Sequence, residues 1–107
     1  MNDRHFSDFY LAGFTYYDGV EVFQELKIGS KLILKAEPEN RFDPNAVAVF
    51  YNKIMLGYIP KGENKQVSQL LNLGYTELFE ARINRISPES HTEKQIGIVL
   101  RINKKEK

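Results

Sequence analysis

The sequence predicts a mainly β fold: a small six-stranded barrel of the OB-like or SH3-like class, with one or two short helices. Apolar residues come in short runs separated by Gly, Pro, Asn or Asp, which is the spacing of strands and tight turns. The clearest helical period lies in one segment, residues 62–74. With 107 residues, the chain is expected to form a single domain over residues 1–103, followed by a frayed charged tail at 104–107.

The N-terminal third contains two predicted strands and an ambiguous segment. Residues 8–14 are predicted to form a strand, in which Gly13 permits a bulge or a close backbone approach. Residues 18–26 carry an apolar residue at every third position after Asp18, which can cap a helix, so a short helix or helical turn is favoured there. Residues 31–36 alternate between apolar and polar and are predicted to form a half-buried strand.

Four more strands are predicted, at residues 46–51, 54–59, 78–86 and 95–102. Asn52 and Lys53 are expected to join the first two of these as a tight hairpin, because Asn tolerates positive φ. The helix predicted at 62–74 has an apolar stripe of Val67, Leu70, Leu71 and Leu73. Gly74 then occupies the position where a glycine commonly ends a helix.

Little in the sequence indicates catalysis. There is no cysteine, which excludes disulfides, thiolate zinc sites and thiol nucleophiles. His5 and His91 lie in polar surroundings with no neighbour at metal-ligand spacing, and Glu37 and Glu39 flank a proline in a loop where carboxylates are commonly solvated. No phosphate-binding Gly-rich loop or G-x-S-x-G motif occurs. We therefore expect no enzyme, no cofactor and no metal site.

Net charge and hydropathy limit the classes of partner that can be expected. The net charge of +1 argues neither for nor against a polyanionic ligand. The N-terminal segment lacks the apolar region of a secretory signal, and no stretch approaches the ~20 apolar residues of a membrane span. A cytoplasmic protein without membrane contact is expected.

The stretch "ENRFDPNAVAV" (residues 39–49) places Phe42 and Asp43 in a turn before an apolar run. Three further aromatic residues, Tyr16, Tyr17 and Tyr58, together with Lys61, fall at predicted strand ends and could gather at one rim of the barrel. The alternative is that the rings fill the core and that Asp43 only caps its own turn.

These residue types suit one end of a nucleic acid strand. Aromatic faces stack on bases and tolerate any of them, and a lysine neutralises phosphate. A carboxylate beside them would repel phosphate but accept a hydrogen bond from a sugar hydroxyl. Such a site would recognise a free 3′-hydroxyl end rather than the interior of a strand.

Three blocks of the sequence resemble the HIRAN domain family: "FYLAGFTYYDG", "LILKAEPENRFDPNAVAV" and "LGYIPKGENKQVSQLL". The resemblance covers about residues 8–74. It implies an OB-like β-barrel that binds single-stranded DNA through its 3′ end, and, in members attached to helicases, a role in remodelling stalled replication forks.

Carried over by position, the resemblance implies that Tyr16 stacks on a base near the terminus and that Asp43 accepts a hydrogen bond from the terminal 3′-hydroxyl. Asn40 would brace the loop, and Lys61 would contact backbone phosphates. Phe42 stands where those members usually have tyrosine, which keeps the stacking surface and removes a hydroxyl.

Two positions depart from the family pattern. Thr15 stands where the fork-remodelling members have arginine, so a strong phosphate contact is missing. Tyr58 stands in place of a histidine near the 3′ end. We hypothesise that Arg41 supplies a replacement cation.

A rival function is a non-catalytic protein–protein adaptor, because an exposed sheet edge can accept a partner strand. A nuclease is disfavoured by the lack of a metal cluster. The expected partners are single-stranded DNA 3′ ends, with a helicase or nuclease acting in trans as a further candidate.

Overall fold

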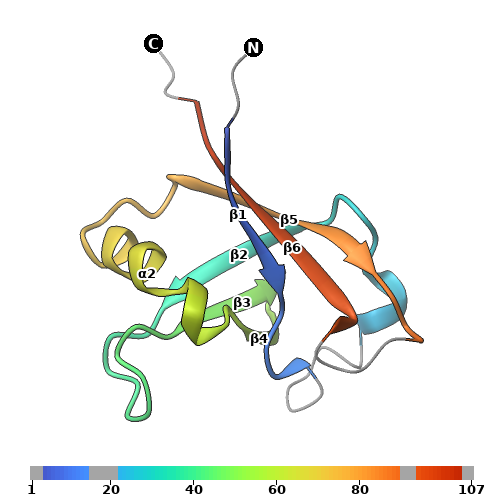
Figure 1. Cartoon of the computed structure of the whole chain (residues 1–107), viewed down its shortest axis with the longest axis horizontal. Coiled ribbons are helices and arrows are strands. Elements are labelled where there is room, and N and C mark those ends of the chain that lie inside the picture. Colours follow the sequence, from blue (N-terminus) through green and yellow to red (C-terminus); the bar gives the residue numbers. More distant parts are fainter. Residues whose placement is uncertain (1–3, 15–21, 90–93, 105–107) are drawn as a thin grey trace.

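The computed structural model describes residues 4–14, 22–89 and 94–104. Within them lie six strands: β1 (His5–Tyr10), β2 (Lys31–Ala36), β3 (Val47–Tyr51), β4 (Ile54–Tyr58), β5 (Phe79–Ile86) and β6 (Ile96–Ile102). They form one antiparallel sheet in the order β1-β6-β5-β2-β3-β4. Figure 1 shows this sheet curling into a half-barrel. The predicted mainly β, six-stranded fold is confirmed.

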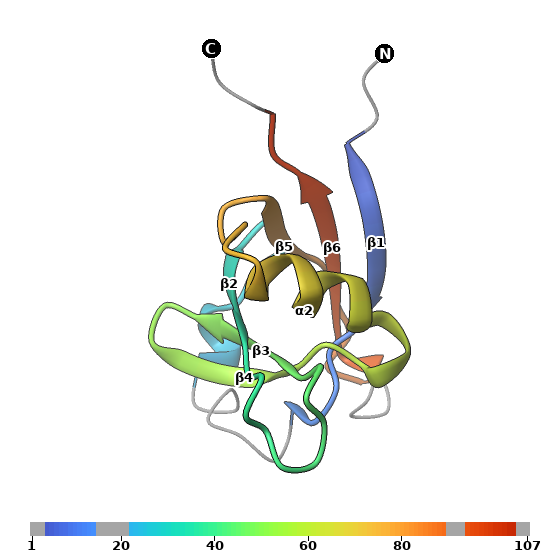
Figure 2. The ribbon, with the colours of Figure 1, turned by 90° about the vertical axis from the view of Figure 1, so that its left-hand side faces the viewer.

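Short helical segments complete the chain: the 3-10 turns η2 (Phe23–Glu25) and η3 (Lys61–Glu63), and the helix α2 (Lys65–Asn72). Figure 2 shows α2 lying across the open side of the curled sheet. Its Val67 and Leu71 are buried in the core with side chains from all six strands. The Ser7 hydroxyl of β1 donates a hydrogen bond of 2.9 Å to the Glu63 carboxylate of η3. The helical segment thus covers the core where the sheet does not.

The two edge strands of the sheet, β1 and β4, are joined at one point just beyond β1. The backbone N–H of Ala12 donates to the carbonyl of Tyr58, and the N–H of Tyr58 donates to the carbonyl of Ala12, both at 2.9 Å. Next to this bridge, a Cβ at Gly57 would collide with the Ala12 carbonyl oxygen. A glycine at position 57 therefore allows the two edges to meet.

The first strand differs from the prediction of residues 8–14. β1 begins and ends earlier because residues 5–10 are the ones that pair with β6. The chain then leaves β6 to reach β4 and places Leu11 and Phe14 in the core. Gly13 has φ +75° in this crossing, a conformation that glycine adopts readily, and it lies in a bend beyond β1 rather than within a strand.

The helix predicted at 62–74 is split into η3 and α2, and Leu73 is 75% exposed, so its place in the apolar stripe was wrong. The helix end is confirmed. Gly74 has φ +101°, its N–H donates to the Leu71 carbonyl, and the N–H of Tyr75 donates to the Leu70 carbonyl. These are the two bonds of a Schellman motif.

The two-residue hairpin between β3 and β4 is confirmed, with Asn52 at φ +53°. Of the helical segment favoured at 18–26, the structure describes only residues 22–26, where η2 lies.

We predict that Gly57→Ala destabilises the fold by about 1–3 kcal/mol, since the added methyl group must push the Ala12 backbone away from β4. Urea denaturation measures the change. Gly62→Ala is the matched control, because a Cβ there meets nothing within 4 Å. Equal midpoints for Gly57→Ala and the unmodified chain would contradict this account of the barrel closure.

Candidate functional site

The loop between β2 and β3, residues 37–45, is organised by the Asn40 side chain. Its Oδ1 accepts hydrogen bonds from the backbone N–H groups of Phe42 (2.9 Å) and Asp43 (3.0 Å), and its Nδ2 donates to the Glu37 carboxylate (3.0 Å). The Glu37 N–H also donates to the Ala46 carbonyl, at 2.8 Å, which closes the base of the loop. One amide side chain thus fixes the backbone on which Phe42 and Asp43 stand.

Both oxygens of the Asp43 carboxylate accept a hydrogen bond. Oδ1 accepts from the Asn45 backbone N–H at 2.9 Å, and Oδ2 accepts from Asn64 Nδ2 at 2.9 Å. The Asn45 and Asn64 bonds, followed by the nearby charge of Lys61, hold the pKa of Asp43 below its usual value. The group is therefore an anion with a fixed orientation at neutral pH.

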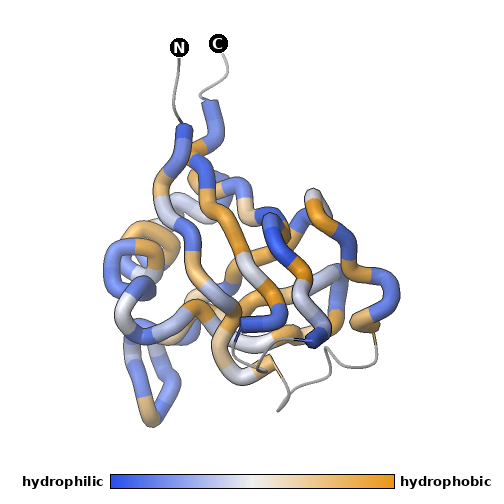
Figure 3. The backbone as a smooth tube through the Cα atoms, turned by 45° about the vertical axis from the view of Figure 1, so that its right-hand side comes forward, coloured by the Kyte–Doolittle hydropathy of each residue, from blue (hydrophilic) through white to orange (hydrophobic). Residues whose placement is uncertain are grey.

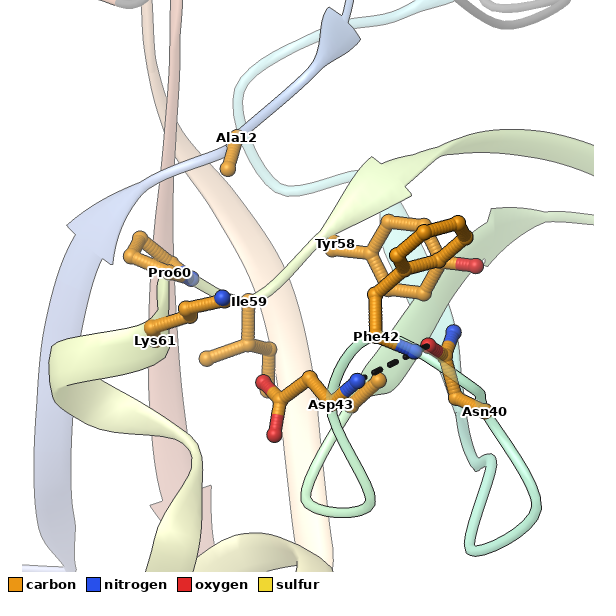
Figure 4. A pocket seen from close by; sticks show the side chains of 9 residues that line it. Ala12, Asn40, Phe42, Asp43, Tyr58, Ile59, Pro60 and Lys61 are labelled. Carbon is orange, nitrogen blue, oxygen red and sulfur yellow. Dashed lines mark hydrogen bonds between the residues drawn. The ribbon is translucent and has the colours of Figure 1, made fainter.

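Asp43 lines a groove of about 410 Å³. The lining residues are Ala12, Asn40, Phe42, Asp43, Ala46, Tyr58, Ile59, Pro60 and Lys61. In Figure 4 the rings of Phe42 and Tyr58 lie on one side, Pro60 and Lys61 lie on the other, and the Asp43 carboxylate lies between them. The groove thus combines two rings, one carboxylate and one ammonium group.

Phe42 is 90% exposed, so this ring does not fill the core, which was the alternative. Its loop projects from the body of the molecule, and Figure 3 shows it as hydrophilic except for a hydrophobic stretch at its end. An aromatic ring this exposed gains little from folding and is available to a ligand.

The remaining sequence-predicted residues are placed as follows. Tyr58 lines the groove, and its hydroxyl donates to Glu37 Oε1 at 2.8 Å. Arg41 is exposed and does not line the groove. The described residues do not include Tyr16, Tyr17 or Thr15, the last of which differs from the family pattern.

Sequence reasoning missed Asn64 and misjudged Glu37. Asn64 is 3% exposed and directs its amide to Asp43 rather than capping α2. Glu37 was expected to be solvated, but it is half-buried and accepts hydrogen bonds from two side chains, those of Asn40 and Tyr58. No local pattern indicates the bond from Tyr58 to Glu37 or the bond from Asn64 to Asp43, since each joins residues that are 21 positions apart in sequence.

The described residues contain no group of three or more His, Asp or Glu residues that could hold a metal ion. No helix among them is long and apolar enough to cross a membrane.

Comparison with protein families gives one match, described as HIRAN domain, over residues 5–104. The chain belongs to the HIRAN domain family. HIRAN domains are in general DNA-binding domains that bind single strands and are generally non-catalytic, and membership supports nucleic-acid binding by this chain. No curated protein matches the sequence.

Two solved structures share the fold. A protein from Lactobacillus plantarum superposes with a TM-score of 0.77 at 21% identity, over 90% of each chain. The HIRAN domain of human HLTF superposes with a TM-score of 0.69 at 17% identity, over 90% of this chain and 73% of that one. At these identities the likeness concerns the fold, which fits a small OB-like barrel.

We predict that the Asp43 carboxyl titrates below 3.8 and that Asn64→Ala, which removes a donor to the anion, raises its pKa. Because the folded-state pKa is the lower one, the stability that this group contributes is complete above about pH 4 and is lost as the pH falls further. Carbon-13 NMR titration of the Asp43 carboxyl carbon measures the midpoint.

Asn72→Ala, at the exposed far end of α2, is the control and should leave that midpoint unchanged. An Asp43 midpoint that is equally low with and without the Asn64 amide would contradict the role given to this hydrogen bond.

Proposed function

We propose that this chain binds single-stranded DNA by its free 3′-hydroxyl end, without catalysing a reaction. The observation that carries the proposal is the ionised Asp43 carboxylate, held in place by Asn45 and Asn64, inside a groove walled by aromatic rings and flanked by Lys61. A groove for the interior of a strand would not place a fixed anion where phosphates pass.

The Asp43 carboxylate can still accept a hydrogen bond from a hydroxyl group. An ionised carboxylate offers about four acceptor positions, and Asn45 and Asn64 occupy one on each oxygen. A sugar hydroxyl can donate to a remaining lone pair, whereas a terminal phosphate meets electrostatic repulsion. Asp43 therefore favours a strand that ends in a 3′-hydroxyl over one that ends in a 3′-phosphate.

The other groups of the groove can bind the bases and the phosphates of the last nucleotides. Phe42 and Tyr58 offer ring faces on which any base can stack, and Lys61 offers a cation to a backbone phosphate on the 5′ side of the terminus. Asn40 acts indirectly, by holding the Phe42 and Asp43 backbone. Tyr16 is included in the proposal on the family resemblance, and Tyr17 is included because it is a second aromatic residue at the same predicted strand end.

The process that we propose for this activity is DNA repair or the processing of stalled forks, with a helicase or nuclease acting in trans. The rival function, an adaptor that uses a sheet edge, would engage β1 or β4. Those edges already hydrogen-bond to each other at Ala12 and Tyr58, which shortens the edge left for a partner strand.

We predict that a short oligonucleotide ending in 3′-hydroxyl binds at least about tenfold more tightly than the same strand ending in 3′-phosphate, the ratio expected from one charge-assisted hydrogen bond. Asp43→Asn should remove most of this preference, because it removes the anion and keeps the shape. Fluorescence anisotropy at fixed salt measures both affinities.

Glu39→Gln is the matched control, since Glu39 is an exposed carboxylate of the same loop that does not line the groove. The preference of Glu39→Gln for 3′-hydroxyl over 3′-phosphate should equal that of the unmodified chain. Weak binding that is equal for both strand ends would favour the adaptor, and cleavage of the oligonucleotide would indicate an enzyme.

We also predict that Lys61→Ala weakens binding and flattens the salt dependence of the affinity by about 0.7 in log–log slope, the value for one lost phosphate contact on a single strand. The same measurement on Arg41→Ala tests whether Arg41 makes the phosphate contact that is missing because position 15 is threonine rather than arginine. Lys53→Ala, in the exposed turn between β3 and β4, is the control. An unchanged slope for Lys61→Ala or Arg41→Ala removes that residue from the phosphate contacts.

A further inference from the structure

Tyr58 belongs to a row of residues that crosses the outer face of the barrel. It pairs with Ala12 on one side and with Ala48 of β3 on the other, and Ala48 pairs in turn with Lys35 of β2. Residues directly opposite each other in an antiparallel sheet point to the same face. The neighbouring row, Leu34 and Val49, points into the core, so the row that contains Tyr58 points outward.

Ala48 is completely buried although it points outward. The Tyr58 hydroxyl donates to Glu37 Oε1 at 2.8 Å, and Glu37 directly follows β2, two strands away from β4. Strands are about 4.8 Å apart, so this bond carries the side chain across β3. The ring must therefore pass over Ala48, and Figure 4 shows its hydroxyl on the side turned away from Ala12.

We infer that Ala48 and Glu37 are positioning residues that hold the Tyr58 ring flat against the sheet, so that its outer face is a platform for one nucleobase. Ala48 leaves room beneath the ring, and Glu37 fixes its far end. This inference rests on the proposed function and adds to it a requirement for a base on the terminal nucleotides, separate from the requirement for a hydroxyl.

Glu37 also connects the platform to the carboxylate. The same Oε1 that accepts from Tyr58 accepts from Asn40 Nδ2, and Asn40 holds the backbone N–H groups of Phe42 and Asp43. Glu37 Oε1 thus links the position of the Tyr58 ring to the position of the Asp43 carboxylate. The alternative, that Tyr58 only covers Ala48 to complete the fold, predicts no effect of the ring on base binding.

The test compares 3′-hydroxyl oligonucleotides with and without bases on their last two nucleotides. Removing the bases should weaken binding to the unmodified chain by about tenfold, within the range for stacking of a base on an aromatic ring. In Tyr58→Leu, which still covers Ala48 with an apolar side chain, the penalty should fall, because Phe42 is then the one ring of the pair on which a base can stack. Ala48→Val, which lifts the ring but keeps its chemistry, should also reduce it.

Glu37 is tested by rescue. Glu37→Ala should lower the penalty for base removal, and Glu37→Gln, which keeps an acceptor for the Tyr58 hydroxyl, should restore it. A purely structural role of Glu37 would change the melting temperature but would leave this ratio unaltered. Equal ratios for Glu37→Ala and the unmodified chain overturn the positioning role.

The preference for 3′-hydroxyl over 3′-phosphate separates the two proposals. If the unmodified chain shows both this preference and a penalty for base removal, and Tyr58→Leu lowers the penalty, both proposals are supported. If the unmodified chain shows the preference but no base penalty, or a penalty that Tyr58→Leu leaves intact, the platform is overturned and the proposed function stands. If the preference is absent from the unmodified chain, the proposed function itself is overturned.

Discussion

The groove depends on a loop that carries its own hydrogen-bond acceptor. Residues 37–45 leave the sheet, and two successive backbone N–H groups of this loop converge on the Asn40 side-chain oxygen. Without this acceptor, the turn would have to leave both donors to water, and the Asp43 carboxylate would have no fixed position. Asn45 and Asn64 then hold the carboxylate from two sides. The ligand that we propose for this groove would meet an anion whose orientation is already fixed, which lowers the entropy lost on binding.

The same contacts that close the barrel build the groove. The bridge between Ala12 and Tyr58 joins the two edges of the sheet, and both residues line the groove. Asn64, at the start of the helix that covers the core, supplies a donor to Asp43. A change in how the sheet closes or how the helix docks would therefore alter the site. The fold and the shape of the groove are thus coupled through a few short hydrogen bonds.

Much of this arrangement could be predicted from sequence. The strands, the hairpin at Asn52 and the helix end at Gly74 follow from local alternation and turn chemistry. Phe42 and Asp43 stood out in the sequence because a turn does not need a large aromatic ring. The start of β1, the hydrogen bonds of Glu37 and the role of Asn64 could not be predicted, since each depends on a partner brought close only by the closed sheet.

The most direct test of the central claim is a crystal structure of the chain with a short single strand that ends in a 3′-hydroxyl. The account predicts that the terminal 3′-oxygen lies within hydrogen-bonding distance of the Asp43 carboxylate. It also predicts that the last bases lie against the rings of the groove. A strand that crosses the groove with its interior, or a terminus bound on another face, would contradict the claim that a fixed carboxylate selects the end of a chain.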